Sequence, residues 1–307
     1  MRIRNGWLFA LTIWATALVA QQQVVECRPA MGTPWSITVS TTDTTAAHEA
    51  IQQAYQRIAS VERCMSDYRS DSEINRLTRS PIGKWHPVSD DLYQVLTFSL
   101  ELAHWSGGAF DPTVGALTRL WRRAFRQQRF PDRAKIETAT DLVGYRYLHL
   151  RKKAVRFDQD RLSLDLGGVA KGFALDAASE VLREAGFTAY LIDGGGDLLL
   201  GDPPTGRVAW HVSTPAGPVD TARVAIATSG NAFRYLEWEG KRYSHLIDPR
   251  TGLGIIDPRS VTVFAPTGMA ADGLASAVSV MGEGAWKDSR GRFPEISVWW
   301  SSPEGHW

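Results

Sequence analysis

The sequence predicts an α+β fold with mixed or antiparallel sheets, because helical and strand patterns occupy different parts of the chain. Apolar residues recur every three or four positions over 46–66, 92–102 and 170–185, which is typical of amphipathic helices. Glycines follow the second and third stretches and are expected to end those helices. The β-rich runs are short and gather later in the chain, so a regular βαβ alternation is not expected.

The expected strands are rich in β-branched and aromatic residues and are separated by turn-forming residues. Glu239 and Gly240 stand between two such runs and are typical of a hairpin turn. We expect strands at 35–39, 208–213, 224–228, 235–238, 243–247 and 261–264.

The N-terminus has the pattern of an export signal. Arg2 and Arg4 precede an apolar run over 7–20, which is shorter than the roughly 20 residues that a membrane span needs. We therefore interpret residues 1–20 as a signal peptide or a retained N-terminal anchor that attaches the protein to the membrane. Both alternatives predict a periplasmic or other extracytoplasmic location, with residues 21–307 forming a single domain.

Composition excludes several classes of protein. The chain has 307 residues, 44% apolar and 22% charged, which is ordinary for a soluble globular protein. A net charge of +1 does not suggest a nucleic-acid partner. The chain has two cysteines, Cys27 and Cys64, which either pair in an oxidising compartment or remain free thiols. The residues before Cys27 do not resemble a lipoprotein signal, so lipidation is not expected.

Common nucleotide, zinc and serine-hydrolase motifs are absent from the sequence, so a site must come from dispersed residues. Glycine-rich segments are candidates, because glycine lets the backbone approach a ligand closely, although each segment alone is also typical of a turn. The segment that leads into the helix expected at 170 is the best phosphate-binding candidate. The segments are 106–113, 165–172, 193–197, and 229–231 together with 245–252.

Asp272 and Ser276 are four residues apart and lie on one face of a helix. A carboxylate and a hydroxyl in that arrangement suit a hard cation that prefers oxygen ligands. A helix-capping aspartate followed by a buried serine explains the same spacing, so both interpretations stay open at this point.

The order of the segments matches the motifs of one family. The matching runs are 31–37, 65–74, 108–115, 143–145, 165–176, 194–197, 229–231, 245–252 and 271–277. With these runs the chain resembles the ApbE family, the FAD:protein FMN transferases, over about residues 31–281. The resemblance implies an ApbE-like fold in which helices pack around one FAD cleft.

The resemblance also implies an activity. Members of the family bind FAD with Mg²⁺ and move its FMN half onto a threonine hydroxyl of an acceptor protein, releasing AMP and forming a phosphoester. Typical acceptors resemble extracytoplasmic subunits of membrane ion-pumping flavin oxidoreductases. The expected partners are therefore FAD and an acceptor protein with a target threonine, and no nucleic acid.

Site residues follow from the same resemblance, position by position. The metal ligands would be the main-chain oxygen of Gly168 and the side chains of Asp272 and Ser276, where serine replaces the family's usual threonine and keeps the hydroxyl. His245 would be the general base for the threonine hydroxyl, since imidazole titrates near neutral pH. Asp248 would orient it or cap the turn that follows. The flavin-contacting residues would be Met31, Tyr68, Ala109, Phe110, Asp111, Asp165, Lys171 and Ile247.

Alternatives remain open. Met31 and Phe110 are also explained as core residues near the pocket. An FAD pyrophosphatase, in which water replaces threonine, would use the same metal site, because the nucleophile is not part of this chain. A passive extracytoplasmic FAD-binding protein would bind FAD without cleaving it.

Overall fold

The computed structural model describes residues 21–215, 217–230, 235–302 and 305–306. The expected signal or anchor at 1–20 and Asn231 of the 229–231 motif lie outside the described residues. No helix within the described ranges is long and apolar enough to cross a membrane.

The main sheet confirms the predicted α+β class with antiparallel strands. It has 8 strands in the order β1-β2-β6-β7-β10-β15-β16-β17, and each neighbouring pair is antiparallel. The order departs from the sequence order, so strands far apart in the chain lie side by side. The strands are β1 (Gln22–Ala30), β2 (Thr33–Thr41), β6 (Tyr190–Gly194), β7 (Leu198–Leu200), β10 (Val224–Ser229), β15 (Ser260–Ala265), β16 (Ser297–Ser302) and β17 (Gly305–His306).

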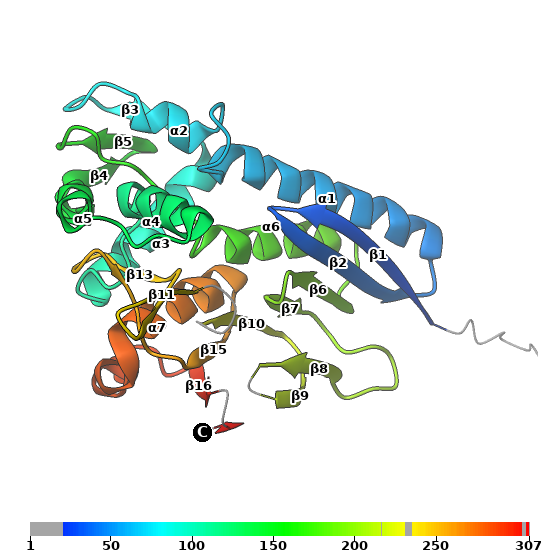
Figure 1. The fold of residues 1–307 in the computed structure, drawn as a ribbon. Helices are drawn as coiled ribbons and strands as arrows, with labels where there is room; N and C mark the ends of the chain where they lie inside the picture. The colour runs from blue at the N-terminus through cyan, green and yellow to red at the C-terminus, as the bar shows by residue number, and fades with distance from the viewer. Residues whose placement is uncertain (1–20, 216, 231–234, 303–304, 307) are drawn as a thin grey trace, which may run out of the picture.

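Three long helices pack against this sheet. They are α1 (Thr44–Met65), α6 (Ala170–Glu184) and α7 (Gly268–Ser289). α1 contacts α6, α6 contacts α7, and α7 contacts β10 and β15 (Figure 1). The fully buried side chains of Ile37 and Val263 belong to the main core, which these helices cover.

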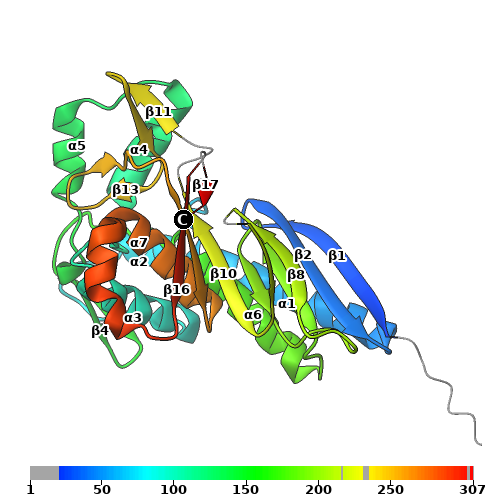
Figure 2. The ribbon, with the colours of Figure 1, turned by 90° about the horizontal axis from the view of Figure 1, so that it is seen from below.

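The other helices and strands gather mainly at the end of the molecule opposite β1 (Figure 2). The helices are α2 (Glu73–Thr78), α3 (Asp90–Trp105), α4 (Gly115–Gln127), α5 (Arg133–Thr140), η1 (Tyr145–Tyr147) and η2 (Arg290–Arg292). The strands are β3 (His86–Pro87), β4 (Leu148–Arg151), β5 (Ala154–Phe157), β8 (Trp210–Thr214), β9 (Gly217–Thr221), β11 (Tyr235–Trp238), β12 (Lys241–Ser244), β13 (Ile247–Asp248) and β14 (Leu253–Gly254).

The three predicted helices are confirmed as α1, α3 and α6. The hairpin turn at Glu239 and Gly240 is also confirmed: both have positive φ, and β11 pairs with β12 around them. The single strand expected over 243–247 is wrong. The Leu246 amide donates a hydrogen bond to Ser244 Oγ at 3.0 Å, and this local bond bends the chain between β12 and β13.

The disulfide alternative is not realised in the structure, where Cys27 and Cys64 are both free thiols. Cys64 Sγ instead lies 3.2 Å from Glu73 Oε2. Burial raises the pKa of the Cys64 thiol to about 12, with the Glu73 carboxylate adding to the effect.

Candidate functional site

The predicted metal ligands come together where the start of α6 meets α7. A Cβ added to Gly168 would lie 2.9 Å from Ser276 Oγ and 3.2 Å from the Phe110 ring. The three residues therefore approach closely, and a side chain at position 168 would press on the Ser276 hydroxyl. Ser276 Oγ also lies 3.4 Å from the hydroxyl of Ser229, at the end of β10.

Asp272 is buried on the same face of α7 and contacts the first turn of α6. Its Oδ2 accepts a hydrogen bond from the Gly172 amide at 3.0 Å. Gly172 lies in the first turn of α6, where backbone amides have no acceptor within the helix, and the Asp272 carboxylate supplies one. Gly168 precedes the N-cap residue Val169, so its carbonyl stands outside the helix, in keeping with the predicted role of a main-chain ligand.

A cation and a second carboxylate complete this cluster. Lys171 Nζ forms an ion pair with Asp197 Oδ2, and Asp197 Oδ1 accepts from the Thr228 amide at 3.3 Å. The pKa of Asp272 is raised to about 7, mainly by burial and secondly by the nearby Asp197 charge, and Lys171 opposes this shift. Burial opposes the charged form of Lys171, but Asp197 and Asp272 nevertheless raise its pKa.

These groups fit a hard divalent cation. Gly168 offers a carbonyl, Asp272 a carboxylate and Ser276 a hydroxyl, and Mg²⁺ prefers such oxygen donors and keeps water or substrate oxygens as further ligands. Within the described part of the chain no group of three or more His, Cys, Asp or Glu side chains is arranged to hold a metal. The cluster contributes one ionisable ligand and is therefore unlike a zinc centre.

Asp165 lies in a second charged cluster beside the first. Its Oδ1 accepts from the Gly167 amide at 2.8 Å, and its Oδ2 accepts from Arg122 on α4 at 3.0 Å. Arg122 also pairs with Asp67, and its guanidinium lies 4.2 Å from the centre of the Tyr68 ring. Burial raises the pKa of Asp67, and the Asp165 charge adds to this.

The loop that carries Ala109 and Asp111 runs beside Asp165. The Asp165 amide donates to the Pro112 carbonyl at 2.9 Å. Asp111 is buried, and its carboxylate accepts from the Thr113 hydroxyl at 2.6 Å and the Tyr145 amide at 2.9 Å. Burial raises the pKa of Asp111 against these hydrogen bonds. The carboxylate thus holds the loop in shape, a structural task that the sequence did not reveal.

The remaining flavin candidates have different surroundings. Phe110 belongs to the main core, and its ring also lies close to Gly168. Its interpretations as a core residue and as a flavin-contacting residue are therefore compatible. Met31 packs partly against the same core in the turn between β1 and β2, where its φ is 50°. Tyr68 is 76% exposed. Ile247 packs in a separate cluster with Leu117, Trp121 and Ala139.

His245 lies in the bend between β12 and β13, with an exposed side chain. Both carboxylate oxygens of Asp248 bind the Arg250 guanidinium, at 2.8 and 2.9 Å. The Gly252 amide donates to the Asp248 carbonyl at 2.8 Å. Of the two roles considered for Asp248, these contacts support the one that shapes the turn.

Sequence reasoning missed Arg122, which joins Asp165, Asp67 and Tyr68. Burial favours the neutral guanidinium, but Asp165 and Asp67 raise its pKa, so it stays charged. The sequence feature that points to Arg122 is the repetition of arginine along α4, where no acidic residue occurs. That pattern alone does not reveal which arginine faces inward.

Comparison with known proteins shows the family of the chain. The sequence profile of the ApbE family matches residues 31–298. The chain belongs to the ApbE family. Two curated relatives from this family are named FAD:protein FMN transferase. The one from Vibrio cholerae is 32% identical over 297 residues, covering 91% of this chain and 88% of the relative. The one from Treponema pallidum is 32% identical over 260 residues, covering 76% and 72%.

Solved ApbE structures share the fold. The flavin transferase ApbE from Vibrio cholerae superposes with a TM-score of 0.84 at 28% identity, covering 94% of this chain and 96% of that one. The flavinyl transferase ApbE of Pseudomonas stutzeri gives 0.83 at 27% identity, covering 94% of both chains. The predicted family, fold and transferase class are therefore confirmed.

Proposed function

We propose that this chain transfers the FMN half of FAD to a threonine hydroxyl of an acceptor protein in a magnesium-dependent reaction. The threonine Oγ forms a bond to the phosphorus of the FMN half. The phosphoanhydride bond to the adenylate breaks, and AMP leaves. The threonine proton passes to His245, so the products are a phosphoester-linked FMN and AMP.

The observation that carries this proposal is the meeting of Gly168, Asp272 and Ser276 at the start of α6. These three oxygen donors would hold Mg²⁺. When bound, the ion neutralises negative charge on the FAD pyrophosphate. The names of the relatives, FAD:protein FMN transferase, support the same substrate.

Neighbouring side chains have tasks that follow from their placement. Lys171 supplies a positive charge beside Asp272 and attracts the pyrophosphate. Asp165 is held by Arg122 and the Gly167 amide, which orients it as an acceptor for flavin or ribityl groups. Tyr68 offers an exposed aromatic surface to the flavin rings. Met31, Ala109, Phe110, Asp111 and Ile247 complete the proposed flavin-binding set.

His245 is the proposed general base. Its exposed position allows a hydroxyl from another protein to reach the imidazole. A positioned base typically contributes about 10²–10⁴-fold to the rate. We expect His245→Ala to lower kcat by that order while FAD binding persists. His211→Ala is the matched control, because His211 is also exposed and pairs with Asp220 on β9.

The decisive experiment incubates the full chain with FAD, Mg²⁺ and an extracytoplasmic flavoprotein subunit of a membrane ion-pumping oxidoreductase. Mass spectrometry is expected to find one FMN on a threonine and an equal amount of AMP in solution. Free FMN with no adduct would identify a pyrophosphatase instead. Bound, uncleaved FAD would identify a passive binding protein.

The proposed metal ligands are tested separately, with a matched control variant on the same helix. Asp272→Ala is expected to abolish adduct formation, because it removes the one charged ligand in the proposed set. Ser279→Ala changes another serine on α7, whose hydroxyl contacts the Ser229 carbonyl at 3.5 Å, and is expected to keep activity. Equal activity of the Asp272→Ala variant and the wild type would contradict the proposed site.

We also propose an extracytoplasmic location, on the basis of the signal or anchor pattern in residues 1–20. Cell fractionation of the producing organism is expected to find the protein in the periplasm or on the inner membrane. Intact mass distinguishes the two alternatives, since a cleaved signal removes about the first twenty residues. Recovery of the full-length chain in the cytosolic fraction would refute the location.

A further inference from the structure

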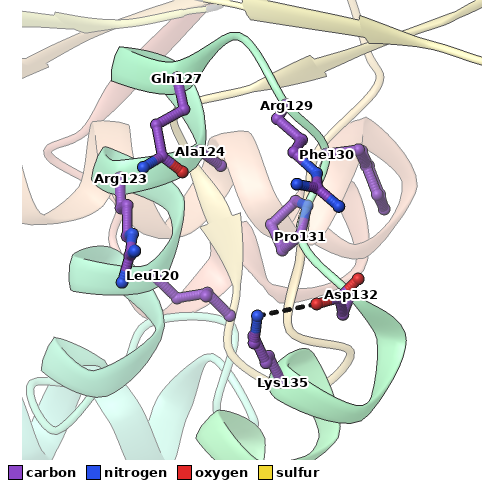
Figure 3. A pocket seen from close by; sticks show the side chains of 9 residues that line it. All are labelled: Leu120, Arg123, Ala124, Gln127, Arg129, Phe130, Pro131, Asp132 and Lys135. Carbon is purple, nitrogen blue, oxygen red and sulfur yellow. Dashed lines mark ion pairs between the residues drawn. The ribbon is translucent and has the colours of Figure 1, made fainter.

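A hollow of about 250 Å³ lies between α4 and α5, and none of its lining residues belongs to the proposed FAD site. Figure 3 shows its walls: side chains of α4 on one side, and those of the connection and the start of α5 on the other. The lining residues are Leu120, Arg123, Ala124, Gln127, Arg129, Phe130, Pro131, Asp132 and Lys135.

The walls of the hollow carry more positive than negative charge, with Asp132 as the acidic residue among the lining residues. Lys135 is paired with Asp132 at 2.8 Å, and the charge of Arg129 acts on the same carboxylate without forming an ion pair. Arg123 forms no ion pair with any residue in the described ranges. Residues 115–129 contain five arginines and no acidic residue, although the whole chain has a net charge of +1. Such local excess charge costs stability through repulsion and typically serves to attract an anionic partner.

An aromatic wall connects the hollow to the bend that carries His245. The Phe130 ring stacks on Trp238 of β11, with centroids 5.5 Å apart and an angle of 18°. It also meets Tyr243 of β12 edge-on at 4.9 Å. β12 ends one residue before His245. Trp238 is 46% exposed, so apolar surface is accessible beside the arginines.

α4, which lines the hollow, also contacts residues of the proposed FAD site. Arg122, next to Arg123, binds Asp165 at 3.0 Å. Trp121 Nε1 donates to the Gly252 carbonyl at 2.8 Å, which attaches α4 to the segment that follows His245. α4 therefore stands between the hollow and the groups proposed to bind FAD.

We propose that this hollow is the docking site for an acidic segment of the acceptor protein, adjacent in sequence to the target threonine. Arg123 and Arg129 bind the carboxylates, and Phe130 with Trp238 contacts the apolar side chains between them. This inference rests on the proposed transfer to a protein threonine and identifies what selects the acceptor. Arginine and exposed aromatic residues are the side chains enriched at protein interfaces.

Shape favours a peptide over a lipid surface. Arg123 and Arg129 face a concave space bounded by two helices, and a flat bilayer cannot enter it. Membranes instead attract convex polybasic segments or amphipathic helices.

The test measures binding and transfer separately in the full-length protein with FAD and Mg²⁺. The probes are two fluorescein-labelled synthetic peptides with one threonine, one flanked by aspartates and the other by asparagines at the same positions. Fluorescence anisotropy gives Kd, and mass spectrometry of the adduct gives kcat and KM. The variant is R123E/R129E. The matched control is R207E/R292E, which reverses two exposed arginines outside the hollow.

We expect wild type to bind the acidic peptide more tightly than the neutral one, with affinity falling as salt is raised. R123E/R129E is expected to raise Kd and KM for the acidic peptide about tenfold, with kcat unchanged. The Kd and KM of R123E/R129E for the neutral peptide should differ from the wild-type values by less than about twofold. The same limit is expected for the Kd and KM of R207E/R292E for the acidic peptide. Circular dichroism melting checks that both variants fold.

Three results would overturn the docking site: equal wild-type binding of the two peptides, equal effects of the two double variants, or arginine-dependent binding to phosphatidylserine vesicles but not to the acidic peptide. Failure of the proposed function is distinguishable from these. In that case the acidic peptide still binds through Arg123 and Arg129, but neither it nor an acceptor protein receives FMN.

Discussion

The Gly172 amide donates a hydrogen bond to Asp272 Oδ2 at 3.0 Å, joining residues one hundred positions apart. A Cβ at Gly172 would lie 2.1 Å from the Gly268 carbonyl oxygen and 2.8 Å from the Asp272 Cβ. α6 and α7 therefore touch backbone to backbone at this point. The contact holds the carboxylate of α7 against the first turn of α6.

Gly172→Ala is expected to destabilise the protein by about 3 kcal/mol, because the added methyl group meets backbone that has no room to move. Urea unfolding monitored by circular dichroism measures the change. Gly284→Ala is the matched control: it is also on α7 and has no atom within 4 Å of its Cβ position. Equal stability of the two variants would contradict the close packing of α6 and α7.

Gly168→Ala is expected to act on metal binding more than on folding. The new Cβ would press on the Ser276 hydroxyl at 2.9 Å, and a serine side chain can rotate away. Rotation removes one proposed ligand, so the Mg²⁺ concentration for half-maximal adduct formation should rise about tenfold or more. Gly284→Ala again serves as control. An unchanged Mg²⁺ dependence would show that Ser276 is not a ligand.

Arg122→Ala is expected to lower the free energy of unfolding by about 2 kcal/mol, because it leaves Asp67 and Asp165 close together without their shared cation. The side chain of Arg122 is 28% exposed, so solvent screens part of the loss. Adding Asp67→Asn to the Arg122→Ala variant should recover stability by removing the repulsion. A double variant with a lower free energy of unfolding than Arg122→Ala would refute this explanation.

Asp176 is expected to make stability depend on pH. Its carboxylate accepts from the amides of Gly268 and Met269 at 2.6 and 2.9 Å, at the start of α7. Burial nevertheless raises its pKa from 3.8 to about 6, against those two hydrogen bonds. The raised pKa means that the folded state holds the proton more tightly than the unfolded chain. Its stabilising effect is present below about pH 4 and is lost as pH rises through about 6.

Asp176→Asn removes the titrating carboxyl group, so this variant is the reference for measuring its effect on stability. Without metal, the free energy of unfolding of wild type relative to the Asp176→Asn variant should fall by about 3 kcal/mol between pH 4 and pH 8. Urea unfolding at both pH values gives the difference. A wild-type advantage that grows with pH would mean that the two amide hydrogen bonds outweigh burial.

Local patterns were sufficient where one stretch of chain buries its own apolar face. The helices over 46–66 and 170–185 follow from their periodicity, and they form because neighbouring turns present one continuous stripe to the core. The hairpin at Glu239 and Gly240 follows from turn chemistry alone. β1 was not predicted because Val24 is its only buried residue, so apolar alternation is absent. Its pairing with β2 makes it a strand.

The sequence by itself determined the family, the α+β class and the residue types available for binding a metal and a phosphate, because these depend on the order and spacing of short motifs. Tertiary structure alone decided which groups meet. It placed Asp272 on the Gly172 amide, Arg122 between two carboxylates, and Arg123 in a separate hollow. Helical periodicity in the sequence of α4 accounts for the burial of Leu117, Trp121 and Ala124. Long-range packing sets the distances to groups far along the chain, and no local pattern encodes which of these groups the arginines of α4 meet.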